Sequence, residues 1–327
     1  MTRYFLGVDS GGTKTHALIA DESGQAIYLA TGGPGNQESI GYDRLALLLE
    51  SVISEACRGA SIDRHQLIGA GFGNAGYDWN ADIAPHREII DALLPGVPYE
   101  IVNDAVVGLL AGSSTGWGVA VVAGTGCNCW GRDAQGRLGR VTGEGIGMGE
   151  FGGASELVHR AIQQISIAWS KRGPETRLAE ALMDYVGETD VERFLEGICR
   201  RRFRVPPAAA PLIFQVADEG DAVAQECLRW SGRELGSLAV GVIRQLQFEA
   251  LEFEVVMSGS LHKGGGLMTD SLKETVRAVA PRARFVRLTA PPVAGGIFLA
   301  MQAAGLSHLP MRDRLIESTA QLVAENV

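Results

Sequence analysis

The chain has 327 residues, of which 46% are hydrophobic and 20% are charged. This length predicts about two domains, each large enough to bury its own core. Lysine and arginine number 29 and aspartate and glutamate number 38, which gives a net charge of −9. An acidic chain of this kind is not a general binder of nucleic acid. Any phosphate that it binds must therefore be held by local geometry.

The cysteines and the N-terminus indicate the cellular compartment of the protein. Five cysteines form no CxxC pair, which predicts reduced thiols in a cytoplasmic protein. The chain reaches a carboxylate at Asp9 too early for a signal peptide. Residues 105–131 carry no charge and are long enough to span a bilayer, but glycine-rich turns interrupt them. We expect a helix, a turn and a buried strand there, and no membrane partner.

Alternating apolar residues and turn signals predict three strands at the start of the chain, at Tyr4–Val8, Thr15–Asp21 and Ala26–Thr31. An amphipathic helix follows at Tyr42–Cys57. The other predicted elements of the first half alternate between strand and helix: Leu67–Phe72, Ile83–Leu94, Tyr99–Val102 and Ala105–Ala111.

The second half begins with a predicted strand–turn–strand and becomes helical from about Glu150 to Gln247. The predicted elements outside this helical stretch are strands Gly118–Ala123, Asn128–Arg132, Phe253–Ser258 and Arg284–Leu288, and helices Met268–Val279, Val293–Ala304 and Arg312–Glu325. The chain is therefore of the α/β class. We expect one domain of residues 1–115, a second of 116–305 with a helical insertion at about 155–250, and a C-terminal helix or tail of 306–327.

The two halves carry a short internal repeat. Four positions of the first half recur 112 residues further on: Gly12, Thr13, Asp21 and Gly24 match Gly124, Thr125, Asp133 and Gly136. In each copy an apolar strand enters a Gly-Thr loop, and a second strand ends in an Asp-x-x-Gly turn. This predicts two related halves with a cleft between them and one phosphate loop from each.

The first glycine-rich loop, residues 8–15, does not match the common nucleotide motifs. A dinucleotide fingerprint needs GxGxxG before a helix, and a Walker A loop needs a lysine where Thr13 stands. A β-hairpin phosphate loop fits better, because the backbone N–H groups of Gly11 and Gly12 would form an anion nest. Thr13 and Thr15 would add hydroxyl donors, Lys14 would either bind phosphate or face solvent, and Asp9 would hold Mg²⁺. An ordinary glycine hairpin is the alternative.

Five ordered segments carry a resemblance: Asp9–Thr15, Asn103–Ala105, Ala123–Gly126, Val255–Ser260 and Pro292–Ile297. They resemble the motifs of the sugar kinases in the actin/hexokinase/heat-shock chaperone ATPase superfamily. The best match is the N-acetylglucosamine kinase-like branch, which includes the BadF/BadG-type ATPases. The resemblance extends from residue 4 to about 305. It implies two actin-like (ribonuclease H-like) halves with a nucleotide cleft between them, and ATP and Mg²⁺ as cofactors.

The resemblance also implies roles for single residues. Asp104 would be the general base that deprotonates the sugar hydroxyl, and Asn103 and Asn36 would bind the sugar. Helix capping or turn formation is the alternative for all three. The residues that would bind ATP in addition to those of the first loop are Gly124, Thr125, Gly126, Gly259 and Ser260. Close helix packing is the expected role of Gly295 and Gly296.

One loop departs from the branch, which has Gly-Trp-Gly followed by Gly-Asp-Glu-Gly-Ser. Here Glu144 replaces the tryptophan, and Glu150 falls where the sugar-binding aspartate would be. Glu150 can still accept hydrogen bonds from sugar hydroxyls. Glu144 either faces an amino group, which would suit unacetylated glucosamine, or points into solvent.

These residues predict ATP-dependent phosphorylation of an amino sugar, with N-acetylglucosamine as the expected small-molecule substrate and a homodimer as the expected assembly. Glucosamine or another hexose is the first alternative acceptor. A second alternative is an activator ATPase without sugar kinase activity, in which Cys127 and Cys129 would serve an iron–sulfur cluster. A non-catalytic sensor is disfavoured, because it would not need both Asp9 and Asp104.

Overall fold

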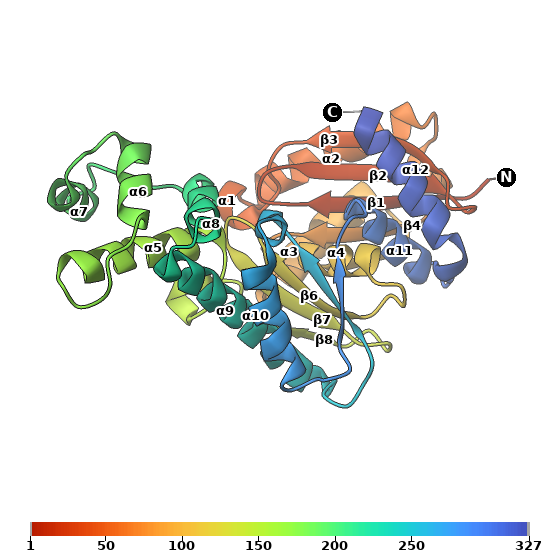
Figure 1. Cartoon of the computed structure of the whole chain (residues 1–327). Helices are drawn as coiled ribbons and strands as arrows, with labels where there is room; N and C mark the ends of the chain where they lie inside the picture. The colour runs from red at the N-terminus through yellow and green to blue at the C-terminus, as the bar shows by residue number, and fades with distance from the viewer. Residues whose placement is uncertain (1, 326–327) are drawn as a thin grey trace.

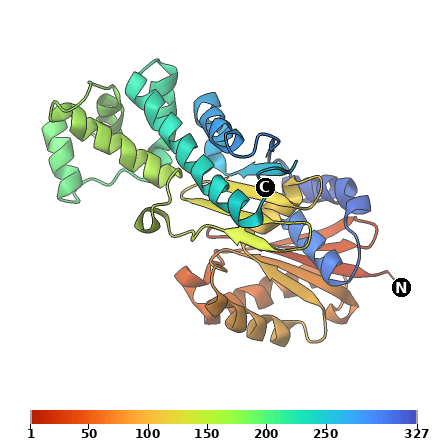
Figure 2. The same ribbon diagram turned by 90° about the horizontal axis from the view of Figure 1, so that it is seen from below.

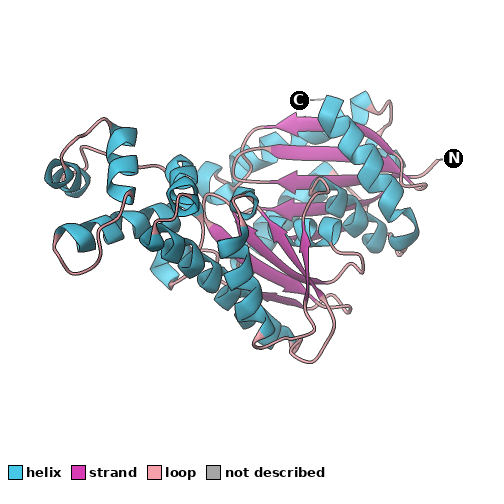
Figure 3. Ribbon diagram, in the orientation of Figure 1, coloured by secondary structure: helices cyan, strands magenta, loops and turns pink. Residues whose placement is uncertain are grey.

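Two mixed five-stranded sheets form the frame of the computed structural model, which describes residues 2–325 (Figures 1 and 3). The first sheet has the order β3-β2-β1-β4-β5, with β1 Tyr4–Ser10, β2 Thr15–Asp21, β3 Ala26–Gly32, β4 Leu67–Asn74 and β5 Tyr99–Val102. The second has the order β8-β7-β6-β9-β10, with β6 Gly118–Ala123, β7 Cys127–Arg132, β8 Leu138–Arg140, β9 Glu254–Ser258 and β10 Arg284–Arg287. The α/β class is confirmed.

Helices cover both sheets. Those of the first half are α1 Gln37–Ile40, α2 Tyr42–Gly59, α3 Asn80–Leu93 and α4 Asp104–Gly112. Those of the second half are α5 Ala154–Trp169, α6 Leu178–Val186, α7 Val191–Cys199, α8 Ala210–Asp218, α9 Ala222–Leu246, α10 Gly266–Arg277, α11 Val293–Ala303 and α12 Arg312–Glu325. Short 3₁₀ turns lie at Arg64–Gln66, Gly145–Met148, Pro207–Ala209, Ser260–Lys263 and Leu309–Met311.

The two sheets are built alike, as the repeat predicted. In each, the first strand pairs antiparallel with the second and parallel with the fourth. The Asp-x-x-Gly turns also match. The carboxylate of Asp21 accepts the backbone N–H groups of Ser23 (2.9 Å) and Gln25 (3.1 Å). That of Asp133 accepts the N–H groups two and four residues further on, at 2.9 and 2.7 Å.

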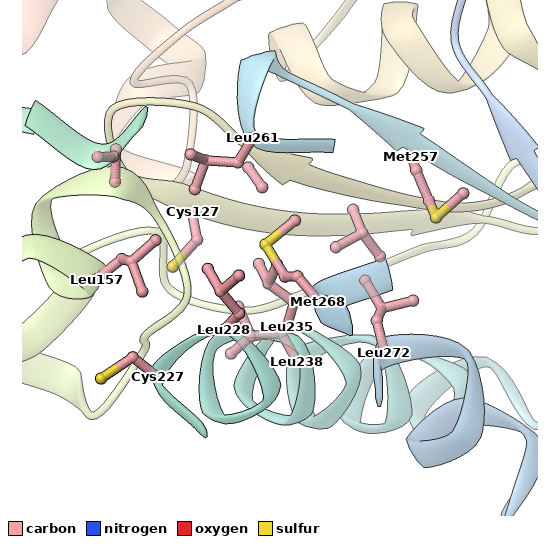
Figure 4. Close-up of a cluster of buried hydrophobic side chains, with 14 of the residues drawn as sticks. Cys127, Leu157, Cys227, Leu228, Leu235, Leu238, Met257, Leu261, Met268 and Leu272 are labelled. Carbon is pink, nitrogen blue, oxygen red and sulfur yellow. The ribbon is translucent and has the colours of Figure 1, made fainter. Parts of the chain in front are cut away.

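Helices α5 to α9 lie between β8 and β9 in the chain, and α6 and α7 lie farthest from the first sheet (Figures 1 and 2). Between the second sheet and helix α9 lies a buried cluster to which Cys127, Leu235 and Met257 belong (Figure 4). Hydrophobic burial of this kind stabilises the insertion against the sheet.

Helices α4 and α11 connect the halves. Helix α11 follows the second sheet in the chain but packs on β1 and β4 of the first, and it also contacts α4. Glycines allow this approach: a Cβ atom at Gly71 would overlap the Gly296 carbonyl oxygen, and one at Gly295 would overlap the backbone of Val107. The packing role predicted for Gly295 and Gly296 is confirmed.

The uncharged stretch of residues 105–131 forms α4, β6 and most of β7, in agreement with the predicted helix, turn and strand. No helix within residues 2–325 combines the length and the apolar character needed to cross a membrane. Some details differ from the sequence expectation, among them the short helix α1, which was not predicted. Strand β8 was not predicted, and α3 begins at Asn80 rather than Ile83.

Candidate active site

The first glycine loop is a tight turn between β1 and β2. The Gly11 N–H donates to the Lys14 carbonyl oxygen (3.0 Å), and the Gly35 N–H donates to the Gly11 carbonyl oxygen (2.9 Å). These bonds bring the segment before Asn36 against the loop. A Cβ atom added at Gly12 would meet nothing within 4 Å, and Gly12 does not have a positive φ. Neither packing nor backbone conformation requires glycine at this position.

The second loop, between β6 and β7, has the same character. The Gly124 N–H donates to the Gly126 carbonyl oxygen (3.0 Å), and the carbonyl oxygens of Gly124 and Thr125 each accept an N–H from the first turn of α5 at 2.9 Å. A Cβ atom at Gly124 or Gly126 would also meet nothing within 4 Å, and neither has a positive φ. Both predicted phosphate loops therefore leave open space that a ligand can fill.

Two carboxylates lie at the ends of strands in the first half. Asp9 is near the end of β1, and Asp104 is the first residue of α4, directly after β5. Burial, and then the charge of Asp104, raise the pKa of Asp9 to about 7, while Lys14 opposes this shift. Burial raises the pKa of Asp104 to about 6, and backbone hydrogen bonds at the start of the helix partly offset it. The charges are thus close enough to interact.

Both predicted asparagines cap helices. The Asn103 Oδ1 accepts the Ala105 N–H (2.9 Å) at the start of α4, and the Asn36 Oδ1 accepts the Glu38 N–H (2.8 Å) at the start of α1. A Cβ atom at Gly76 would lie 2.6 Å from the Asn36 Oδ1, so Asn36 faces the segment that follows β4. Each capping bond uses the Oδ1 atom of the asparagine. Contact of either side chain with the sugar stays a prediction.

The loop between Thr142 and Glu150, whose sequence differs from the pattern of the N-acetylglucosamine kinase-like branch, contains two glutamates in different environments. Glu150 is buried, and its carboxylate accepts the N–H of Thr142 (2.6 Å), the Thr142 hydroxyl (2.8 Å) and the N–H of Gly143 (2.8 Å). It therefore ties the two ends of the loop together. Glu144 is exposed and its backbone N–H donates to the Thr142 Oγ1 (3.3 Å), whereas its carboxylate forms no hydrogen bond with any other residue in 2–325. Contact of either residue with the sugar stays a prediction.

Gly259 and Ser260 follow β9, and Ser260 lines a cavity of about 330 Å³. Gly259 has φ +101°, and a Cβ atom there would overlap the Ala123 carbonyl oxygen, so close contact with β6 requires glycine. The cavity adjoins the second loop, because the N–H of Ala154 in its wall donates to Gly124. Its other lining residues are mostly apolar: Pro207, Ala208, Ala210, Pro211, Phe214, Leu261, Lys263 and Gly264.

Three residues near Asp104 were not predicted from sequence. The Asn103 Nδ2 donates to the Asp78 Oδ1 (3.2 Å), and Trp79 follows at the start of α3. Arg140 of β8 stacks on the Trp79 ring, with 4.4 Å between its guanidinium carbon and the ring centroid. Nothing in the sequence marks Asp78, because its importance depends on the pairing of β4 with β5, which brings it beside Asn103.

Comparison with known proteins agrees with this arrangement. Residues 6–286 match the model of the BadF/BadG/BcrA/BcrD ATPase family. An N-acetyl-D-glucosamine kinase of Dictyostelium discoideum is 26% identical over 312 residues, which cover 91% of this chain and 98% of that protein. An N-acetylmuramic acid/N-acetylglucosamine kinase of Clostridium acetobutylicum is 23% identical over 304 residues, with coverage of 91% and 98%.

Solved structures agree in fold. A candidate N-acetylglucosamine kinase from Chromobacterium violaceum superposes with a TM-score of 0.63 at 24% identity, covering 91% of this chain and 98% of that one. A ROK family glucokinase from Streptomyces griseus, in complex with glucose and AMPPNP, has a TM-score of 0.55 at 20% identity, covering 92% and 100%. The predicted actin-like fold with two halves is confirmed. This chain belongs to the BadF/BadG/BcrA/BcrD ATPase family.

Proposed function

We propose that this protein is an ATP-dependent sugar kinase whose acceptor is an amino sugar, with N-acetylglucosamine as the first candidate. The observation that carries the proposal is the open space beside Gly12, Gly124 and Gly126, in two loops that each follow a strand end, together with the interacting carboxylates Asp9 and Asp104 beside the first loop. Such a space suits the phosphates of ATP, because backbone N–H groups can then approach the phosphate oxygens closely. The kinase names of the two curated relatives support the choice of acceptor.

In the proposed reaction, the oxygen of a sugar hydroxyl attacks the γ-phosphorus of ATP. The new O–P bond forms as the bond between the γ-phosphorus and the β–γ bridging oxygen breaks, and ADP leaves. Asp104 takes the hydroxyl proton. A carboxylate with a pKa of about 6 is ionised at neutral pH and is a better base than an ordinary aspartate.

Asp9 is the residue proposed to hold Mg²⁺, which would supply positive charge beside the phosphates. The donor fits, since Asp9 is a carboxylate beside the first loop, and a cation there would offset the burial and the charge of Asp104 that raise the pKa of Asp9. The adenine base is proposed to lie in the cavity beside Ser260, where the apolar lining suits a flat ring.

The acceptor itself is tested by ADP release with Mg·ATP. The panel is N-acetylglucosamine, glucosamine, N-acetylmannosamine, glucose and no sugar. Strong stimulation by N-acetylglucosamine supports the proposal, and preference for glucosamine supports the first alternative. In the latter case Glu144→Gln should reduce the preference for the free amine; an unchanged preference would remove Glu144 from the account.

The second candidate function is an activator ATPase with a cluster on Cys127 and Cys129. Both thiols lie in the hydrophobic core of the second half, and burial raises the pKa of Cys127 to about 12. A cluster held between two subunits needs cysteines that reach the surface, so the burial of these two side chains disfavours the alternative. The homodimer remains a prediction, which sedimentation velocity tests. The cytoplasmic location also remains a prediction; all five cysteines are free thiols, as expected in a reducing compartment.

A further inference from the structure

The segment between β4 and α3 presents two side chains that the proposed phosphoryl transfer does not use, Asp78 and Trp79. Asp82 fixes the backbone of this segment. Its Oδ2 accepts the N–H groups of Asp78 (3.1 Å) and Trp79 (2.7 Å), and its Oδ1 accepts the Tyr42 hydroxyl (2.9 Å). The backbone from which the Asp78 side chain extends is therefore held by hydrogen bonds within the protein.

Only one of the two oxygens of the Asp78 carboxylate accepts a hydrogen bond from the described residues of the protein. Its Oδ1 accepts from the Asn103 Nδ2 (3.2 Å), and the same asparagine caps the helix that begins with Asp104. The Oδ2 has no hydrogen-bond donor among residues 2–325. Burial and the charge of Glu38 raise the pKa of Asp78 to about 7, although Arg140 opposes them. A partly buried carboxylate with a free oxygen gains stability from a ligand that brings a donor.

Trp79 adds an apolar surface beside this carboxylate. Its side chain is 46% exposed, unusually much for an indole. Arg140 stacks on it from the second half, at 4.4 Å, and lies 5.4 Å from the Trp130 ring. This contact between Arg140 and Trp79 joins the two halves next to Asp78. The position of the Trp79 ring therefore depends on the relative orientation of the two halves. A pyranose has both features that complement such a wall, an apolar C–H face and hydroxyl donors at its edge.

We propose that Asp78 is a sugar-binding residue, whose free oxygen accepts a hydrogen bond from a ring hydroxyl of the acceptor, and that Trp79, held by Arg140, forms the adjoining apolar wall. This inference rests on the proposed kinase function and deepens it. The ligand class is a pyranose with free ring hydroxyls. The Asn103 bridge sets the distance between the bound ring and Asp104.

Steady-state kinetics of Asp78→Asn and Trp79→Ala test the two residues. A lost hydrogen bond to a charged acceptor predicts a rise in the KM for N-acetylglucosamine of roughly 10-fold to 100-fold in Asp78→Asn, whereas the KM for ATP should stay within about threefold. Trp79→Ala should also raise the sugar KM. Two matched controls should change neither constant: Glu88→Gln, an exposed carboxylate on α3, and Trp169→Ala, a tryptophan that is 48% exposed at the end of α5.

Monodeoxy analogues of N-acetylglucosamine identify the bond. For one of these analogues, kcat/KM of the wild-type protein should be lower than for N-acetylglucosamine. The Asp78→Asn variant should have the same kcat/KM for that analogue and for N-acetylglucosamine, because the variant and the analogue remove the same interaction. If Asp78→Asn unfolds, Asp78→Glu with the same analogues gives the comparison. Sugar-stimulated ADP release with an unchanged sugar KM in Asp78→Asn would overturn this inference alone. No sugar stimulation in the wild-type protein would overturn the proposed function as well.

Discussion

Gly295 of α11 lies directly against the backbone of Val107 in α4, where a Cβ atom would overlap the Val107 carbonyl oxygen. Helix α4 contacts strands of both sheets, and α11 contacts the first sheet and α4. This crossing therefore connects the half that carries Asp9 and Asp104 with the half that carries the second predicted phosphate loop. A change in the crossing should affect both halves.

Gly295→Ala should lower the free energy of unfolding by about 1–3 kcal/mol, since the added methyl group has no space and α4 and α11 must separate. Gly241→Ala in α9 is the matched control, because a Cβ atom there meets nothing within 4 Å. It should leave stability unchanged or raise it by up to about 1 kcal/mol. Urea unfolding of the three proteins measures both effects. Equal midpoints for Gly295→Ala and the wild-type protein would contradict the packing described here.

Asp104→Asn should reduce sugar-dependent turnover by roughly 10² or more, because the amide cannot accept the hydroxyl proton. The affinity for ATP should remain, since the predicted phosphate loops do not include this residue. Turnover and nucleotide binding are measured separately, by ADP release and by calorimetry. Near-normal turnover in the variant would remove Asp104 as the general base.

The rate should depend on pH below neutrality. The pKa of Asp104 is raised to about 6 and that of Asp9 to about 7, mainly by burial. Both carboxylates act in the ionised form, so kcat/KM for the sugar should fall as the pH decreases from about 8 to 5. Since Mg²⁺ bound to Asp9 would keep that carboxylate ionised, the acidic midpoint measured at saturating Mg·ATP with the sugar varied should lie near the pKa of Asp104, about 6. A flat profile down to pH 5 would mean that neither group must be ionised.

Thiol reactivity should distinguish one cysteine from the other four. Cys199 is exposed at the end of α7, whereas Cys57, Cys127, Cys129 and Cys227 are buried. Burial raises the pKa of Cys127 and of Cys227 to about 12, which leaves little thiolate at neutral pH. An aromatic disulfide reagent should therefore titrate one thiol rapidly in the native protein and all five in denaturant. Rapid reaction of a second thiol, lost in Cys127→Ser, would contradict the buried position of Cys127.

Much of the fold could be predicted because local patterns and global structure agree. The repeated Gly-Thr loops and Asp-x-x-Gly turns correspond to two sheets of the same strand order, and the turn hydrogen bonds of Asp21 and Asp133 are equivalent. The start of α3 was placed three residues late, because its cap is Trp79. No side chain typical of an N-cap stands there; Asp82, inside the helix, accepts the N–H of Trp79 instead.

The candidate site was less predictable. Motif residues such as Asp9 and Asp104 lie next to strands that the sequence places correctly. Trp79 and Arg140, by contrast, stack only through tertiary structure, which also brings the charge of Arg140 near Asp78, and no local pattern encodes the relative position of the two sheets. The sequence also cannot reveal that the Glu150 carboxylate is occupied by hydrogen bonds within its own loop.

The central claim is that the γ-phosphoryl group passes from ATP to a sugar. The most direct measurement is the ratio of sugar phosphate to ADP, determined by mass spectrometry over a time course with Mg·ATP and N-acetylglucosamine. The account predicts a ratio of one with the sugar present and little ADP without it. ADP formation without sugar phosphate, at a rate that is the same with and without sugar, would contradict a kinase and favour an ATPase that acts on another partner.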